Sequence, residues 1–224
     1  GTSFYSDGAN ADADTNSSAN AVATDQGAFG SGSGSANAVA SGNSQANAIG
    51  ENGGVANTGS GNADATAQGG SSANAAAIEL GDQGGLNANA AANAQNGSQA
   101  NSIGVNNGNA STRSGNASAD ARRGSSANSA GLSSGNFNSQ SGNADTVATN
   151  GSTSAAAGVN VRNNNLQSGN GTAESNNGST ALALGSAFGN NNNPSGNASA
   201  TAQNGAAAFA LGNVTGSNNQ GVGN

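Results

Sequence analysis

The acidic residues near the start of the chain are, by type and spacing, the side chains best suited to chemistry. Asp7, Asp12, Asp14 and Asp25 lie close together in sequence, and carboxylate oxygens are the ligands that a hard cation such as Ca²⁺ prefers. Solenoids that bind Ca²⁺ in every turn carry a Gly-Gly-x-Gly-x-Asp series, whereas Gly81-Asp82 is not repeated. The pattern therefore favours a solvated acidic end over a metal site.

The residues that most enzymes use for acid–base or nucleophilic chemistry are missing. The chain has no His and no Cys, which removes the usual general bases, the thiol nucleophile and the commonest metal ligands. We therefore expect no enzyme activity and no cofactor. With four basic residues and a net charge of −7, few side chains could neutralise phosphates, so no nucleic-acid partner is expected. No apolar run approaches the ~20 residues of a membrane helix, which argues against membrane insertion.

The frame that positions these side chains is a sequence repeat of about 27 residues. The letters Ser-Gly-Asn-Ala stand at 195–198 and recur at 141–144, 114–117 and 60–63. A strict repeat of this length predicts a solenoid, in which each unit buries its apolar face against its neighbours. We expect one repeat domain over residues 1–224 with about eight coils, approximately 7–33, 34–60, 61–87, 88–114, 115–141, 142–168, 169–195 and 196–224.

Each coil contains two short segments in which alanine alternates with other residues. The first reads Asn-Ala-x-Ala-x-Ala, as at 62–67 and 116–121, and a period of two predicts a strand with alanine on one face. A turn such as Asn150-Gly151 follows, because these residues tolerate positive φ. Alanines of both strands placed inward predict an all-β solenoid with a thin alanine-lined core. The last third of each coil is expected to be a loop or a weakly ordered third side.

Asparagine and serine recur at fixed positions of the repeat. Stacked amides about 4.8 Å apart can donate to one neighbouring coil and accept from the other, so we expect polar ladders along the solenoid. One column is Asn62, Asn89, Asn116, Asn143, Asn170, Asn197 and Asn224. A second is Asn20, Asn47, Asn74, Asn101 and Asn128, and a serine column includes Ser44, Ser71, Ser98, Ser125 and Ser152.

The alternate positions of the second strand become apolar toward the end of the sequence, at Leu182, Leu184, Phe209 and Leu211. Two interpretations remain open. Either these side chains lie on an outer face and contact a partner or another copy, or the coil widens and buries them. An exposed Leu and Phe cluster favours the first, a subunit contact.

The segments Ser44–Gly50 (Ser-Gln-Ala-Asn-Ala-Ile-Gly) and Ser98–Gly104 (Ser-Gln-Ala-Asn-Ser-Ile-Gly) carry a resemblance. They resemble the head repeats of trimeric autotransporter adhesins, whose β-roll coils have a Ser-x-Ala-x-Gly-type consensus, and the chain is loosely similar to curlin-type fibre repeats. The likeness covers about a third of each coil, and the period of this chain departs from both families. It implies an extracellular or cell-surface protein of bacterial type.

A structural role is the first functional hypothesis. Solenoids that stay monomeric need atypical polar end units, and open coil edges invite pairing. The sequence stops in phase at Asn224 without a charged cap, which predicts head-to-tail self-association into a fibre or cell-surface filament.

Two other functions compete with the structural one. Ice binding uses flat small-residue solenoids but wants a regular outward array, whereas the column Asn37, Asp64, Ala91, Ser118, Asp145, Thr172 and Ser199 is mixed. Adhesion to a surface ligand would use the variable third segment, which contains Phe29, Phe137 and residues 163–166, because loops that vary on a fixed frame commonly carry binding.

Overall fold

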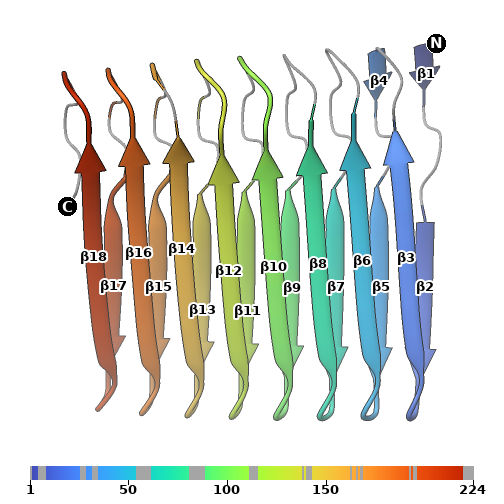
Figure 1. Cartoon of the computed structure of the whole chain (residues 1–224). Helices are drawn as coiled ribbons and strands as arrows, with labels where there is room; N and C mark the ends of the chain where they lie inside the picture. Colours follow the sequence, from blue (N-terminus) through green and yellow to red (C-terminus); the bar gives the residue numbers. More distant parts are fainter. Residues whose placement is uncertain are drawn as a thin grey trace.

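Two β-sheets lie face to face in the computed structural model of the chain (Figure 1). Their strands point in opposite directions, so each coil runs along one sheet, turns, and returns along the other. The structure describes residues 2–4, 9–25, 29–31, 35–53, 62–80, 89–110, 116–137, 139, 143–161, 163–164, 166, 169–191, 193 and 196–218.

Each of the two main sheets contains eight strands. Sheet I consists of β2 (Ala9–Asp14), β5 (Ala36–Ser41), β7 (Ala63–Gln68), β9 (Ala90–Gln95), β11 (Ala117–Arg122), β13 (Ala144–Thr149), β15 (Gly171–Asn176) and β17 (Ala198–Gln203). Sheet II consists of β3 (Ser18–Asp25), β6 (Gln45–Asn52), β8 (Ser72–Glu79), β10 (Gln99–Asn106), β12 (Ser126–Ser133), β14 (Thr153–Val161), β16 (Thr180–Phe188) and β18 (Ala207–Thr215). The short strands β1 (Thr2–Phe4) and β4 (Phe29–Ser31) pair separately.

The register between neighbouring strands is one whole sequence repeat throughout both sheets. Ala117 pairs with Ala144, Ala144 with Gly171, and Gly171 with Ala198, all in parallel. The described residues contain no helix. The sequence-based prediction of an all-β solenoid, in which each coil is one repeat, is therefore confirmed.

The interior is a double layer of small side chains. On β11, Ala117, Ala119 and Ala121 are buried while the residues between them face outward. The core is less uniform than the alternation suggests, because Ser102 and Thr146 occupy inward positions and their buried hydroxyls have no hydrogen-bond partner. Most inward positions hold small side chains, and serine and threonine replace alanine at a cost in polar burial. Asn106 on β10 and Asn160 on β14 are larger buried exceptions.

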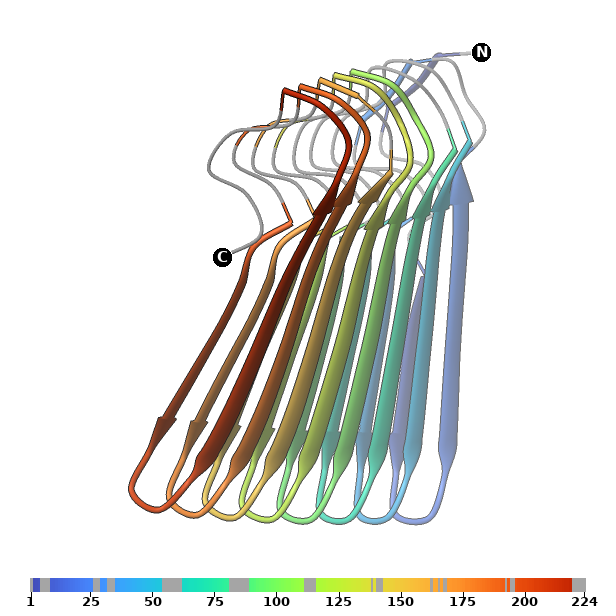
Figure 2. The same cartoon turned by 60° about the vertical axis from the view of Figure 1, so that its left-hand side comes forward.

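The tight turns between the sheets are pairs of residues with positive φ. Asn150 has φ 60° and Gly151 has φ 74°, and Asn177 with Gly178 repeats the geometry. Asparagine and glycine adopt this conformation at the least cost. Figure 2 shows these turns together at one end of the slab.

Glycines on sheet II let the two sheets approach closely at the other end. A Cβ added at Gly158 would lie 1.8 Å from the carbonyl oxygen of Asn170, and one at Gly185 would lie 1.7 Å from that of Asn197. Any side chain here would collide with backbone. Gly131, Gly158 and Gly185 therefore mark the place where sheet II lies against the residues that precede β13, β15 and β17. Alanine holds the same register position on β3 and β8.

Candidate functional surfaces

The serine column forms a continuous buried ladder. The backbone N–H of Ser71 donates to Ser98 Oγ at 3.1 Å, and the N–H of Ser98 donates to Ser125 Oγ at 3.1 Å. Each hydroxyl also donates to a carbonyl of its own turn, as Ser98 Oγ does to Gln95 at 2.5 Å. The same bonds join Ser17, Ser44, Ser71, Ser98, Ser125, Ser152 and Ser179.

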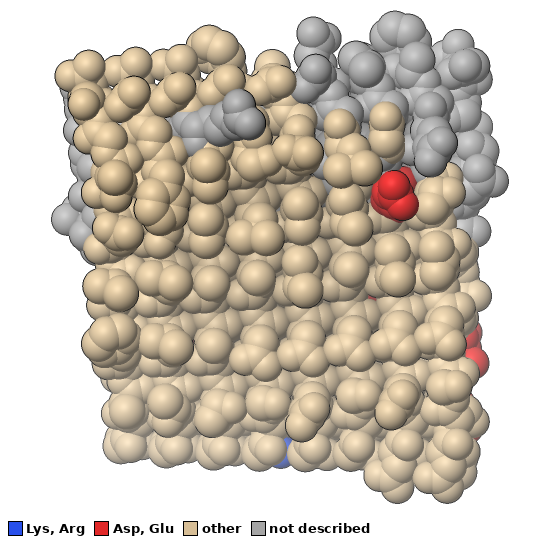
Figure 3. All heavy atoms as spheres, in the orientation of Figure 1, with Lys and Arg blue, Asp and Glu red and all other residues tan. Residues whose placement is uncertain are grey.

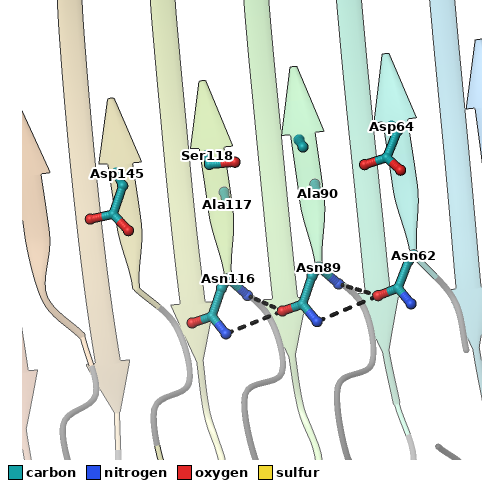
Figure 4. Close-up of a pocket in the computed structure, with 9 residues that line it drawn as sticks. Asn62, Asp64, Asn89, Ala90, Asn116, Ala117, Ser118 and Asp145 are labelled. Carbon is teal, nitrogen blue, oxygen red and sulfur yellow. Dashed lines mark hydrogen bonds between the residues drawn. The ribbon is translucent and has the colours of Figure 1, made fainter. Parts of the chain in front are cut away.

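The half-buried asparagine column is also a ladder, but backbone groups supply most of its donors. Asn62 Oδ1 accepts from the N–H of Asn89 at 3.0 Å and from its Nδ2 at 3.4 Å. The backbone bond recurs through Asn116, Asn143, Asn170 and Asn197, and Figure 4 shows its first steps. Asn224 lies outside the described residues. The ladder therefore joins the starts of the sheet I strands from β7 to β17.

The exposed asparagine column joins side chain to side chain, as the stacking argument expects. Asn47 Nδ2 donates to Asn20 Oδ1 at 2.8 Å, and Asn74, Asn101 and Asn128 continue the series at 2.8–2.9 Å. This ladder lies on the outer surface of sheet II. It stops where Ala155 takes the asparagine's place in the register.

A fourth ladder in the third segment escaped the sequence analysis. Asn109 Oδ1 accepts from the N–H of Asn136 at 2.8 Å, Asn136 Oδ1 from Asn163 at 3.0 Å, and Asn163 Oδ1 from Asn190 at 2.6 Å. These asparagines recur at a spacing of 27 residues in four successive repeats, so the signal was present but hidden by the abundance of asparagine around it. The described part of the third side is therefore a stacked element.

The outward side chains of sheet I form what we call the acidic face. It carries the carboxylates Asp12, Asp14, Asp64, Asp120, Asp145 and Glu174 together with Arg122. Arg122 Nη2 lies 2.7 Å from Asp120 Oδ2, and this partnership raises the pKa of the guanidinium. An exposed pair of this kind contributes little to stability.

A shallow depression of about 430 Å³ lies on the acidic face around Ala91 (Figure 4). Asp64 and Asp145 border it from strands that are separated by β9 and β11. Partial burial raises the pKa of the Asp64 carboxyl. No group of three His, Cys, Asp or Glu in the described part of the chain could hold a metal ion. Asp7 and the side chain of Asp25 lie outside that part.

The outward side chains of sheet II form a contrasting surface, the apolar face. Its central column is Val22, Ile49, Ala76, Ile103, Ala130, Ala157, Leu184 and Leu211. The exposed asparagine ladder runs on one side of this column and leads to Leu182 and Phe209. On the other side lie Ile78, Val105, Leu132 and Val159. Figure 3 views this face and shows that charged atoms are sparse on it.

The apolar cluster near the end of the sequence lies outward. Leu182 is 44% exposed, Phe209 58% and Leu211 51%, and Leu184 is half-buried in the same face. The coil does not widen to enclose them, so the outer-face interpretation holds. Their role as a subunit contact stays a prediction.

Comparison with known proteins gives no assignment. No family model, curated protein or solved structure matches the chain. In the described residues no helix is long and apolar enough to cross a membrane.

The third segment places two apolar side chains at the surface. Phe137 is largely exposed and has φ 60°, and Leu166 is also exposed. Nothing is described of the side chain of Phe29. Adhesion through this segment stays a prediction.

Proposed function

We propose that this chain is a structural protein, a β-solenoid segment of an extracellular fibre or cell-surface filament in which coils of one copy stack on coils of another. The observation that supports it most is the constant register of both sheets. Each strand presents to the next the same backbone groups and the same ladder positions. A further coil of the same kind could therefore be added without any new type of contact.

The strands at one end of the solenoid support this proposal. Ala198 and Ala200 point inward on β17 but are only half-buried, whereas Ala117 and Ala119 on β11 are buried. A further coil that pairs with β17 and β18 would cover these methyl groups, because parallel strands add to one another through their edges.

The resemblance of Ser44–Gly50 and Ser98–Gly104 to adhesin head repeats supports an extracellular location. Secreted solenoids that stack coils would present their polar third side and their outer faces to the surroundings.

Electron microscopy and fibre diffraction of the purified chain test the proposal. We expect filaments with a meridional repeat near 4.8 Å and a subunit step of about 38 Å for eight strands. Single-chain particles at every concentration would contradict it.

A matched pair of variants sharpens the test. Ala200→Lys places a charge inward on the end strand β17, which should block stacking, whereas Ser199→Lys places the same charge outward on that strand. Only Ala200→Lys should shorten the filaments, by at least tenfold in mean length. Equal filament length in both variants would show that the β17 edge is not the contact.

Ice binding is a second candidate because of the apolar face. The asparagine ladder of the apolar face repeats one side chain at the same position in five successive strands. The mixed column on the acidic face has no such repetition. A thermal-hysteresis measurement tests this, and an absence of activity removes the candidate.

A further inference from the structure

We infer that the apolar face binds the apolar face of a second copy of this chain, so that two solenoids pack sheet on sheet about a two-fold axis that runs along β12. The contact uses the outer surface of sheet II, whereas the proposed filament uses the strand edges. It therefore goes beyond the proposed function and can hold or fail independently.

The distribution of charge selects this face. Among the described outward side chains of sheet II, Glu51 is the single ionisable residue, whereas the acidic face carries six carboxylates. Two copies with a net charge of −7 each repel one another. When the apolar faces meet, the two acidic faces point away from each other across four sheets. At about 10 Å between stacked sheets, they are about 30 Å apart, which is several times the Debye length of about 8 Å in physiological salt.

The face also carries large side chains in one place and a depression in another. Leu182 and Leu184 are large outward side chains on β16. The depression, of about 420 Å³, surrounds Ala76 on β8 and is bordered by Ile49 and Ile103. Both features lie in the same columns of the register, four strands apart in the sheet.

A two-fold axis along β12 brings these features together. It sets β8 of one copy against β16 of the other and β10 against β14, which follows from the strand order of sheet II. Ala76 then faces Leu184, and Ile103 faces Ala157, so that a large side chain meets a small one in both pairs. Each contact occurs twice, as in an isologous dimer.

The area is sufficient for a stable pair. Seven overlapping strands at about 4.8 Å span about 34 Å, and the outward side chains cover about 20 Å along each strand. On the order of 700 Å² per copy, or about 1,400 Å² in total, is within the range of specific protein interfaces. The asparagine ladder suits such a contact, because stacked amides that bond along the ladder occur in dry sheet–sheet interfaces.

Analytical ultracentrifugation over a range of concentrations tests the pairing. In the Ala200→Lys variant, whose end-to-end stacking should be blocked, the chain should reach a closed dimer with twice the 20.7 kDa mass of the wild-type chain. Ile103→Lys places a charge in the contact and should raise the dimer dissociation constant at least tenfold. Val147→Lys, an exposed aliphatic residue on the acidic face, should change it less than twofold. Circular dichroism shows whether both variants fold.

Single cysteines give a second measurement, because the chain has none of its own. Ala130 lies on β12 at the inferred axis, and Ala91 holds a comparable outward, half-buried position on the acidic face. A short bifunctional maleimide should link Ala130→Cys into a dimer across the spacing of about 10 Å between the sheets, whereas Ala91→Cys should remain a monomer. Adding Ile103→Lys should abolish the Ala130→Cys crosslink.

Three results would overturn the inference. They are a folded wild-type monomer at the highest soluble concentration, equal crosslinking at the two cysteine positions, and a monomer that floats with neutral lipid vesicles, which would assign the face to a lipid surface. A mass that grows steadily with concentration and responds to Ala200→Lys but not to Ile103→Lys would support the filament and refute the face-to-face pair.

Discussion

The acidic face and the apolar face lie on the two sides of one alanine interior. On sheet I most outward positions hold carboxylates, amides and hydroxyls, with Val39, Ala91 and Val147 as exceptions, and on sheet II the outward positions include Val, Ile, Leu and Phe beside an asparagine ladder. The interior needs only small side chains, so it leaves the outward residues free to vary. Inward substitutions should therefore disrupt both faces, and outward substitutions should alter only their own.

The largest effect is expected where the two sheets touch. Gly158→Val forces a side chain into the backbone of Asn170, and overpacking of this kind costs about 3 kcal/mol. Urea unfolding followed by circular dichroism should show the loss in a single transition, because both sheets share the site. Gly178→Ala is the control: it has open space but φ 71°, and should cost only about 1 kcal/mol. Equal losses in the two variants would refute the close approach of the sheets.

The second-largest loss of stability is expected in the buried serine ladder. Ser98→Ala leaves the N–H of Ser71 and the carbonyl of Gln95 without their partner, and unsatisfied buried groups cost about 2 kcal/mol. The same measurement on Ser72→Ala, at a half-buried position beside the ladder, should change the unfolding free energy by less than about 0.5 kcal/mol. A neutral Ser98→Ala would show that water replaces the hydroxyl.

Substitutions in the asparagine ladder on the apolar face should change stability less, and in either direction. Asn74→Ala removes two exposed hydrogen bonds between side-chain amides and should lower the free energy of unfolding by about 0.5 kcal/mol. Ala155→Asn places an amide next to Asn128 in the register and should stabilise by a similar amount. Thermal unfolding of both variants measures the two changes in stability. A loss of stability in Ala155→Asn would contradict the ladder as a stabilising element.

The smallest effect concerns pH and belongs to the acidic face alone. Burial raises the pKa of Asp64, so the folded chain holds that proton more tightly than the unfolded chain and loses stability as pH rises through the raised pKa. Asp64→Asn should therefore stabilise the chain at neutral pH by about 0.3 kcal/mol. Ser41 and Thr15 donate to Asp14 and lower its pKa, so this carboxyl loses its contribution as pH falls. Carbon-detected NMR titration should show the two shifts in opposite directions.

The sequence predicts the frame well because two periods coincide in it. Alternation of Ala63, Ala65 and Ala67 fixes which side chains face inward, and recurrence in every repeat fixes what they stack on. Neither period requires long-range information. The register from Ala117 to Ala198 therefore follows from the sequence alone.

The atoms that make each ladder could not be predicted from residue positions. Asn62 and Asn20 recur in the same way, yet one accepts mainly from backbone N–H groups and the other joins side-chain amides. The difference arises because Asn62 is half-buried at the start of a strand, whereas Asn20 stands outward within one. Likewise, the direction of Leu182 and Phe209 depended on coil width, which residue spacing alone does not determine.

The uniform register has a consequence for how such a sequence can change in length. A single inserted residue in one strand would exchange its inward and outward side chains and shift it against both neighbours. Growth is therefore tolerated in multiples of the whole unit, by duplication of one complete repeat at a time. Each duplication extends the solenoid by about 4.8 Å. The number of repeats that the gene encodes therefore sets the length of the solenoid.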